Sequence, residues 1–287
     1  MITSLAYELG FPETAVFSLK KDFDAMWAGK EQLDAALKNL YTDEGAYYRN
    51  TVKGLAEEYG VHIYAAEMTF FLYAALPLRE VYKENGYSDE LYLDTMADLR
   101  YKVKECHDIY GIWGTVAGSW FRDFYLLKRF KLGRLQYEPR PLRFAEYKGY
   151  KQGDIFYGCH IPSCGPMTPE AVLDSLNRAH TFYRAKLKDG ILPVHLRSFL
   201  IYPGHYEVYP EDSNLKKFYE MFDVVGGDEK PDNPYIWRIF GYENCEDYTA
   251  LPERTSLQRR FKEYLLSGKC MGSGDGFLLF DGEKIIR

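Results

Sequence analysis

The chain has 287 residues, of which 46% are hydrophobic and 27% charged, and this composition excludes a disordered chain. Its formal net charge of −6 gives none of the basic surplus that nucleic-acid-binding proteins carry, so we expect no nucleic-acid partner. The longest apolar stretch, residues 68–76, is too short to span a bilayer, so we expect no membrane partner.

The charge distribution and the cysteines indicate the possible ligand, the state of the thiols and the cellular compartment. Residues 121–151 contain nine basic against three acidic residues, which is either a site for a phosphorylated ligand or a solvated basic face. The five cysteines are odd in number and irregularly spaced, so we expect free thiols. The first residues lack the basic start of a signal peptide, and we therefore expect a cytoplasmic protein.

The first 115 residues carry helical patterns only. Pro12 suits a first helical turn, and further helices are predicted over residues 30–40, 44–59 and 62–76, the last ending before Pro77. We therefore predict an all-helical domain over residues 1–115. A fifth helix is indicated by an apolar stripe with spacings of four and three, formed by Tyr92, Met96, Leu99, Val103, Cys106 and Tyr110.

Residues 116–287 alternate strand and helix patterns, which is typical of an α/β or α+β layer. After one more helix near residues 115–127, the glycine-rich segment 272–276 is predicted to be a hairpin loop, since it lacks the spacing of a Walker A motif. Strands are predicted over residues 132–138, 155–161, 194–202, 235–240 and 277–280, and helices over 169–187, 214–222 and 256–266.

The strand, loop and helix between residues 154 and 187 form the strongest local signal. Thr168 is a good N-cap, Pro169 fits the first helical turn, and Gly190 lies just past the helix end. A helix start offers unpaired N–H groups and a partial positive charge, so it is ready to hold a phosphate, although many helix starts bind nothing. The expected backbone donors belong to Cys164, Gly165, Met167 and Thr168, because Pro166 and Pro169 have no N–H.

Three stretches of the chain resemble a known family. LGRLQYE, HIPSCGPMTPEAVLDSL and FLIYPGHYEVYPEDSNLKKFYEMFDVV are similar to two-domain acyltransferase-like proteins of bacteria. That resemblance covers nearly the whole chain and is most specific over residues 132–225. It implies an α+β fold, with a helical N-acyltransferase N-terminal domain over residues 1–115 and a GNAT-like C-terminal domain, built on a mixed sheet with flanking helices, over residues 116–287.

The resemblance also implies acyl-CoA as a co-substrate and no metal. The strand at 156–161 and the helix start at Thr168 would hold pantetheine and pyrophosphate, and the strand at 194–202 would splay away to admit the thioester. GNAT loops usually read Gln/Arg-x-x-Gly-x-Gly/Ala, whereas this loop has one glycine and two prolines, so CoA is either lost or held by a shorter loop. The implied cofactor-binding residues are Cys159, Ile161, Cys164, Gly165, Met167 and Thr168.

Three residues are candidates for proton transfer, because an attacking amine must lose a proton and the departing thiolate must gain one. His160 ends the strand beside the expected site and is either the base or a structural histidine. Glu138 closes the 132–138 strand and is either a base acting through water or a surface carboxylate paired with Arg140. Tyr219 falls where GNAT enzymes often keep a tyrosine acid, and it is either that acid or a core aromatic.

Two further residues, His205 and Glu207, follow a strand end and are predicted either to face the substrate amine or to form a polar turn. Cys159 and Cys164 flank His160, but we expect neither a Cys–His nucleophile nor a zinc site, because no second ligand pair exists at finger spacing. The leading hypothesis is acyl transfer to a small-molecule amine by direct attack in a ternary complex. The alternatives are a catalytically silent GNAT-like binding protein and a hydrolase or other transferase that uses His160 or His205.

Overall fold

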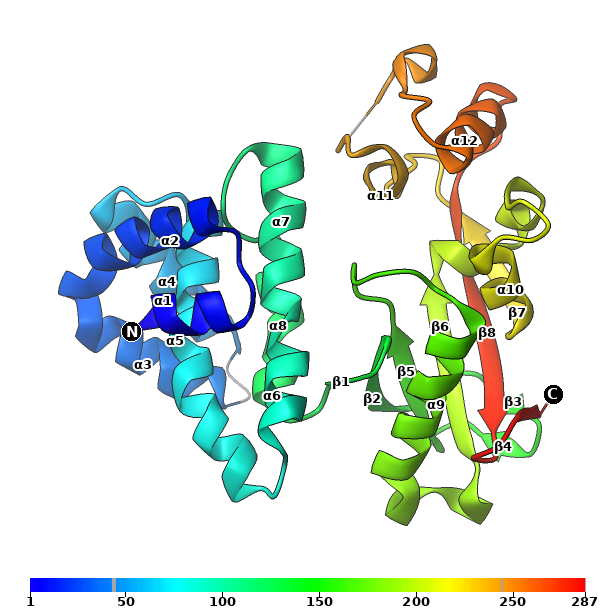
Figure 1. Cartoon of the computed structure of the whole chain (residues 1–287), viewed down its shortest axis with the longest axis horizontal. Helices are drawn as coiled ribbons and strands as arrows, with labels where there is room; N and C mark the ends of the chain where they lie inside the picture. The colour runs from blue at the N-terminus through cyan, green and yellow to red at the C-terminus, as the bar shows by residue number, and fades with distance from the viewer. Residues whose placement is uncertain (43–44, 244, 287) are drawn as a thin grey trace. The chain divides into compact units, whose positions relative to one another are not determined.

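The computed structural model describes residues 1–42, 45–243 and 245–286, and it divides into two compact units, residues 1–131 and residues 132 onwards (Figure 1). The sequence placed the boundary at 115/116. The difference arises from helix α8 (Gly118–Tyr125), which packs on the first unit. The ring of Phe121 contacts that of Phe71, and the hydroxyl of Tyr125 donates a hydrogen bond to the carbonyl of Phe71.

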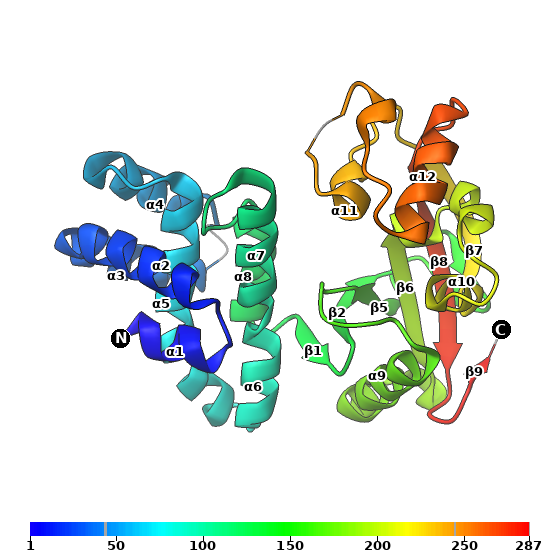
Figure 2. The ribbon, with the colours of Figure 1, turned by 45° about the horizontal axis from the view of Figure 1, so that its top comes forward.

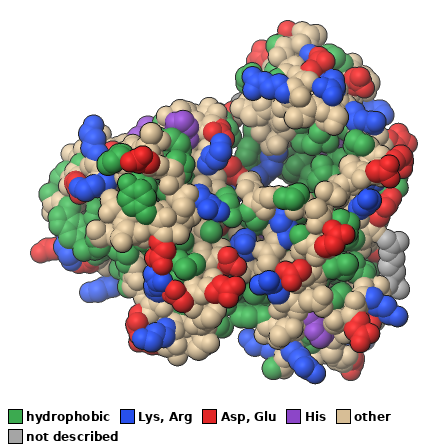
Figure 3. Space-filling view, in the orientation of Figure 1, with side chains coloured by type: hydrophobic (Ala, Val, Ile, Leu, Met, Phe, Trp, Pro, Cys, Tyr) green, Lys and Arg blue, Asp and Glu red, His purple; other side chains and the backbone are tan. Residues whose placement is uncertain are grey.

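The first unit is helical, as predicted, and on the face drawn in Figure 3 its surface interleaves basic and acidic side chains. In the described ranges no helix is long and apolar enough to cross a membrane. The expected start of the third helix at Glu44 lies outside the described residues. The helices are α1 (Ile2–Glu8), α2 (Glu13–Met26), α3 (Lys30–Leu40), α4 (Gly45–Tyr59), α5 (Ile63–Glu84), α6 (Asp89–Met96), α7 (Asp98–Tyr110) and α8, with a short 3-10 turn at Trp27–Gly29.

Helix α5 is the centre of this unit and corrects one prediction. It does not end before Pro77 but continues to Glu84. A proline inside a helix costs about 3 kcal/mol. Leu78 and Tyr82, both beyond the proline, are fully buried, and burying two such side chains offsets that cost. The expected fifth helix is two helices, α6 and α7, divided at Ala97, although its apolar stripe is buried from Tyr92 to Cys106.

The second unit is a mixed sheet with helices, as predicted (Figure 2). Its strands follow the order β1-β2-β5-β6-β8-β7, with β9 paired to β8, and a separate hairpin joins β3 to β4. The strands are β1 (Phe130–Leu132), β2 (Leu135–Pro141), β3 (Glu146–Tyr147), β4 (Tyr150–Lys151), β5 (Ile155–His160), β6 (Leu192–Ser198), β7 (Asp223–Glu229), β8 (Gly272–Phe280) and β9 (Ile285–Ile286); the helices are α9 (Pro169–Tyr183), α10 (Asn214–Glu220), α11 (Ile236–Phe240) and α12 (Ser256–Leu266).

The two faces of the sheet have different coverings. Helix α9 packs on one face. There Ser175 forms a hydrogen bond with the hydroxyl of Tyr137, and the ring of Tyr183 packs against that of Tyr157. The opposite face is covered at one end by the β3–β4 hairpin, whose Tyr147 ring stacks on Phe277 at 4.4 Å. The other end of that second face carries the polar side chains of Glu138, His160, His195 and Asp275, and we call this surface the open face.

Strands β5 and β6 are parallel but pair only at two positions, near the middle of each strand. The paired residues are Tyr157 with Val194 and Gly158 with His195. Strand β5 continues to His160 and β6 to Ser198, so the two strands part beyond this point. This splay agrees with what the resemblance implied for these two segments.

Several predictions about the strands need correction. Residues 235–240 were expected to be a strand and contain helix α11. The strand expected over 194–202 ends at Ser198. Residues 272–276 are not a hairpin loop but the first half of β8, and strand β7 was not anticipated.

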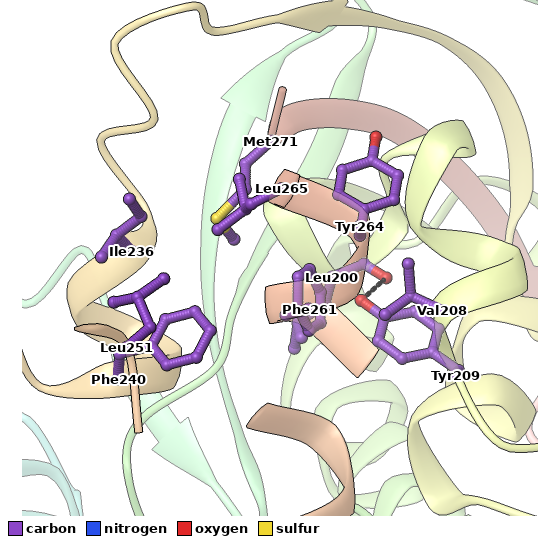
Figure 4. Packing of buried hydrophobic residues seen from close by; sticks show 10 residues of the cluster. All are labelled: Leu200, Val208, Tyr209, Ile236, Phe240, Leu251, Phe261, Tyr264, Leu265 and Met271. Carbon is purple, nitrogen blue, oxygen red and sulfur yellow. Dashed lines mark hydrogen bonds between the residues drawn. The ribbon is translucent and has the colours of Figure 1, made fainter. Parts of the chain in front are cut away.

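Helices α11 and α12 form a small lobe between β7 and β8 with its own apolar core (Figure 4). The core joins Ile236, Phe240 and Leu251 of the lobe to Leu200 and Tyr209, which follow β6. Figure 4 shows the hydrogen bond from the Tyr209 hydroxyl to the carbonyl of Leu200, which is 3.0 Å long. This contact fixes the chain where it leaves β6.

Candidate functional site

Glu138 and His160 meet on the open face of the sheet. Glu138 lies on β2 and His160 on the neighbouring β5, and imidazole Nε2 is 2.8 Å from carboxylate Oε1. The Glu138 side chain is almost completely buried, at 3% exposure, whereas that of His160 is 24% exposed. The Glu138 carboxylate also pairs with the Arg140 guanidinium. Two of the three predicted catalytic residues are therefore neighbours, and the pairing of Glu138 with Arg140 that we considered is present as well.

A second histidine–carboxylate pair, which sequence reasoning missed, lies on the same face. His195 of β6 donates from Nε2 to Oδ1 of Asp275 on β8, at 3.0 Å. Because Nε2 carries the proton in this bond, Nδ1 is left to accept one. Arg197 holds Asp275 from the other side and also pairs with Asp228 of β7. The carboxylate that orients His195 is thus itself held in place by a cation.

Burial favours the neutral form of the His195 imidazole. Desolvation lowers the pKa of His195 below its usual value of 6.5, and the hydrogen bond that His195 donates to Asp275 raises the pKa only in part. The imidazole stacks on Phe277 at 4.7 Å and meets the edge of Phe144, which explains the loss of water around it. A histidine with a lowered pKa is neutral near pH 7, the form that can act as a base.

Gly158 separates the two pairs. It is the register partner of Glu138 on one side and of His195 on the other. A Cβ placed on Gly158 would lie 3.4 Å from the Arg140 side chain and 3.5 Å from that of Glu138, so a side chain larger than that of alanine would crowd both. Since the pairing of β5 with β6 stops at Gly158 and His195, both histidines lie where the two strands cease to pair.

The loop from β5 to α9 has the predicted helix start. The hydroxyl of Thr168 accepts a hydrogen bond from the N–H of Ala171 at 3.3 Å, and Pro169 follows it. Gly165 has φ of +79°, a conformation that favours glycine. The N–H of Cys164 is already bonded to the carbonyl of Pro162 at 2.8 Å, so this expected donor is used within the loop.

The remaining predicted cofactor residues differ in position. Cys159 points to the α9 face and is buried, and desolvation raises the pKa of its thiol to about 12, so it is a packed strand residue on the face opposite to His160. Ile161 packs against the core of the α11–α12 lobe, and Met167 is buried. All five cysteines are free thiols, and no group of three or more His, Cys, Asp or Glu residues in the described ranges is arranged to hold a metal.

The three other candidate residues lie beyond β6. His205 has no exposed surface and is packed against Phe261 and Tyr264, with Nδ1 donating to the carbonyl of Phe199 at 2.7 Å. Such a position is that of a core histidine, and it gives a substrate no access in this structure. Glu207 is exposed, while Tyr219 of α10 is half-buried and its ring contacts that of Tyr206.

Comparisons with known proteins add to this geometry. The model of the N-acyltransferase N-terminal domain matches residues 2–126, and that of the GNAT-like C-terminal domain matches residues 129–278. No curated protein matches the chain.

Crystal structures of an acyltransferase are similar in fold, and each alignment covers 96% of this chain and 86% of that chain. The complex with decanoyl-CoA has a TM-score of 0.75 at 24% identity. The complex with decanoyl-CoA and teicoplanin has a TM-score of 0.73 at 22% identity, and the complex with CoA and 10C-teicoplanin one of 0.70 at 21%.

Proposed function

Since the chain belongs to the family of proteins that join an N-acyltransferase N-terminal domain to a GNAT-like C-terminal domain, we propose that it transfers an acyl group from acyl-CoA to the amine of a small molecule. The observation that carries the proposal is the splay between β5 and β6, flanked by two histidine–carboxylate pairs. The five free thiols favour a reducing compartment, which is the cytoplasm.

The splay and the helix start fit an acyl-CoA. The pantetheine arm would lie between the parted strands, with its thioester beside Gly158 and its diphosphate at the start of α9. Beyond Gly158 no residue of β5 is a register partner of β6. Backbone N–H groups beside the thioester would be the donors that a developing oxyanion needs. Loop residues Gly165, Met167 and Thr168 remain the proposed diphosphate neighbours.

The chemistry requires one proton acceptor and one proton donor. The amine nitrogen bonds to the thioester carbon, the carbon–sulfur bond breaks, the nitrogen loses a proton and the CoA thiolate gains one. His195 and His160 both qualify as the base, since each is oriented by a carboxylate. His195 is favoured by its lowered pKa, and His160 by its place at the strand end. Tyr219 is kept as the proposed acid for the thiolate.

The acceptor is proposed to be bound together with the donor. The similar acyltransferase crystallised with both decanoyl-CoA and teicoplanin supports simultaneous binding of an acyl-CoA and a small-molecule acceptor, and hence direct attack in a ternary complex. If a ternary complex forms, the initial rate depends on the two substrate concentrations according to a sequential rather than a ping-pong rate law. Initial rates measured over a grid of donor and acceptor concentrations distinguish the two.

Thermal stability with CoA tests the first step. A ligand at a hundredfold excess over its Kd stabilises the folded state by about 2.7 kcal/mol, which appears as a higher Tm. We expect such a shift with CoA and with acyl-CoA thioesters of several chain lengths. The second step is release of free thiol from those thioesters in the presence of a panel of amines. Absence of any shift at millimolar CoA contradicts the proposal and favours the catalytically silent binding protein.

A further inference from the structure

Arg134 grips the loop between β5 and α9 through three backbone carbonyls. Its Nη1 donates to the carbonyl of Pro162 at 2.9 Å, its Nη2 to that of Gly165 at 3.0 Å, and its Nε to that of Pro166 at 3.1 Å. Arg134 comes from the tight turn between β1 and β2, next to Gly133, which has φ of +73°. One side chain from outside the loop therefore fixes the orientation of three of its peptide groups.

These hydrogen bonds from Arg134 determine the direction in which the loop amides point. In a trans peptide the carbonyl and the following N–H point in opposite directions. The carbonyl of Pro166 faces Arg134, so the N–H group of Met167 faces away from it. Met167 directly precedes the N-cap Thr168, and at the first turn of α9 further N–H groups and the positive end of the helix favour an anion.

The grip also explains how a loop with one glycine keeps its shape. Glycine-rich phosphate loops let the backbone turn and approach the ligand. Here Pro162, Pro166 and Pro169 restrict the chain, Gly165 supplies the one residue with positive φ, and Arg134 supplies the remaining constraint from outside. A guanidinium suits this task because its N–H groups form a rigid planar fork, whereas a lysine has a single nitrogen.

We infer that Arg134 is the positioning residue of the CoA diphosphate site: it orients the Met167 amide toward the diphosphate and takes the place of the missing glycines. The inference rests on the proposed acyl-CoA site. Arg134 acts through the loop and belongs to neither histidine–carboxylate pair. Its loss therefore weakens recognition of the diphosphate and leaves recognition of the pantetheine arm intact.

The experiment compares Arg134→Lys with the wild-type full-length chain, using CoA and pantetheine as probes. Pantetheine has the thiol arm without the diphosphate. We expect the Kd for CoA to rise about tenfold or more, a loss of about 1.4 kcal/mol or more, because one nitrogen cannot hold three carbonyls. The Kd for pantetheine, measured by chemical-shift titration into the millimolar range, is expected to stay unchanged. A general loss of structure would weaken both ligands together, and that result overturns the inference.

Two further variants complete the test. Gly165→Ala places a Cβ in open space on a residue with φ of +79°, so it disturbs the loop through backbone strain while the Arg134 side chain is unchanged, and it should weaken CoA selectively as well. It serves alone if Arg134→Lys does not fold. Arg178→Lys, on the exposed side of α9 where Arg178 pairs with Asp174, is the matched control and should leave both Kd values unchanged.

The outcomes separate the two proposals. If the wild type does not bind CoA at millimolar concentration, the proposed function fails. If the wild type binds CoA and the ratio of the CoA and pantetheine Kd values is the same in Arg134→Lys and Gly165→Ala, only the role of Arg134 fails.

Discussion

Glu138 and His195 stand in one row across the sheet, with only Gly158 between them. Adjacent strands are about 4.8 Å apart, so the two residues are separated by about two strand spacings. All three positions point to the open face, and the middle one has no side chain. A reacting group at this place would be within reach of both histidine–carboxylate pairs.

Filling the row at Gly158 should block acyl transfer without unfolding the protein. In Gly158→Val the branched side chain would press on Arg140 and Glu138 and occupy the surface between the two pairs. We expect thiol release to fall by about tenfold or more, because small misplacements at a reacting centre have effects of this size. Gly158→Ala is the matched control, since its Cβ makes only ordinary contacts of 3.4 Å or more. Equal activity of the two variants would place the chemistry elsewhere.

Asn substitutions should identify the base. If His195 is the base, His195→Asn reduces turnover by about a hundredfold or more, the usual contribution of general-base catalysis, and His160→Asn reduces it less. If His160 is the base, the order is reversed. Tm values of both variants, measured together with turnover, show whether the loss is catalytic. Equal and small losses for both would remove general-base catalysis by either histidine.

The pH dependence of kcat/KM tests the assignment of His195 as the base. A base works when deprotonated, so log kcat/KM should fall as pH drops through the pKa of His195, which lies below 6.5 because of burial. Asp275 raises that pKa, so Asp275→Asn should move the acid limb to still lower pH while also lowering the plateau. A limb that moves to higher pH in Asp275→Asn contradicts the assignment of His195 as the base.

His205 should make the second unit sensitive to acid. Burial lowers the pKa of His205 to about 4, while the unfolded chain retains the ordinary 6.5. The unfolded state then binds more protons between these values, so stability is fully present above pH 6.5 and falls as the pH drops toward 4. The loss at pH 4 is about 3 kcal/mol.

The measurement is urea unfolding at pH 7 and at pH 4 for the wild type and for His205→Phe. Phe keeps the aromatic packing against Phe261 and Tyr264 but removes the titrating group. The wild type should lose about 3 kcal/mol more than the variant between the two pH values. An identical pH dependence of both proteins would show that His205 is hydrated in solution.

What the sequence revealed was local. The helices at residues 30–40 and 256–266 have the predicted bounds, and the second starts with a capping box between Thr255 and Gln258. Thr168 caps α9 as its position in the sequence indicated. Each of these signals is contained within one turn of chain, where propensity and capping act.

What the sequence hid depends on contacts between distant residues. His195 and Asp275 are 80 positions apart, and neither is marked by its own neighbours. Asp275 was also concealed within the segment 272–276, which has the composition of a loop. The structure shows why it is a strand: Gly272, Gly274 and Gly276 share one face of β8, and Ile201 and Tyr202 pack directly on that face.

Gly274→Ala therefore tests whether these glycines are needed for the packing of Ile201 on β8. A Cβ on Gly274 would collide with the carbonyl oxygen of Ile201, and backbone cannot move aside as cheaply as a side chain. We expect the free energy of unfolding to fall by about 2 kcal/mol, within the range for overpacked cores. Gly226→Ala on the neighbouring β7 is the matched control, because its Cβ meets nothing within 4 Å and should change stability by less than about 0.5 kcal/mol. Equal stability of the two variants in urea unfolding would mean that Ile201 does not pack on β8 in solution.

The same substitution should affect turnover. Because Asp275 lies between Gly274 and Gly276, the Gly274 variant should also weaken the hydrogen bond between His195 and Asp275 and lower turnover, whereas the Gly226 variant should not.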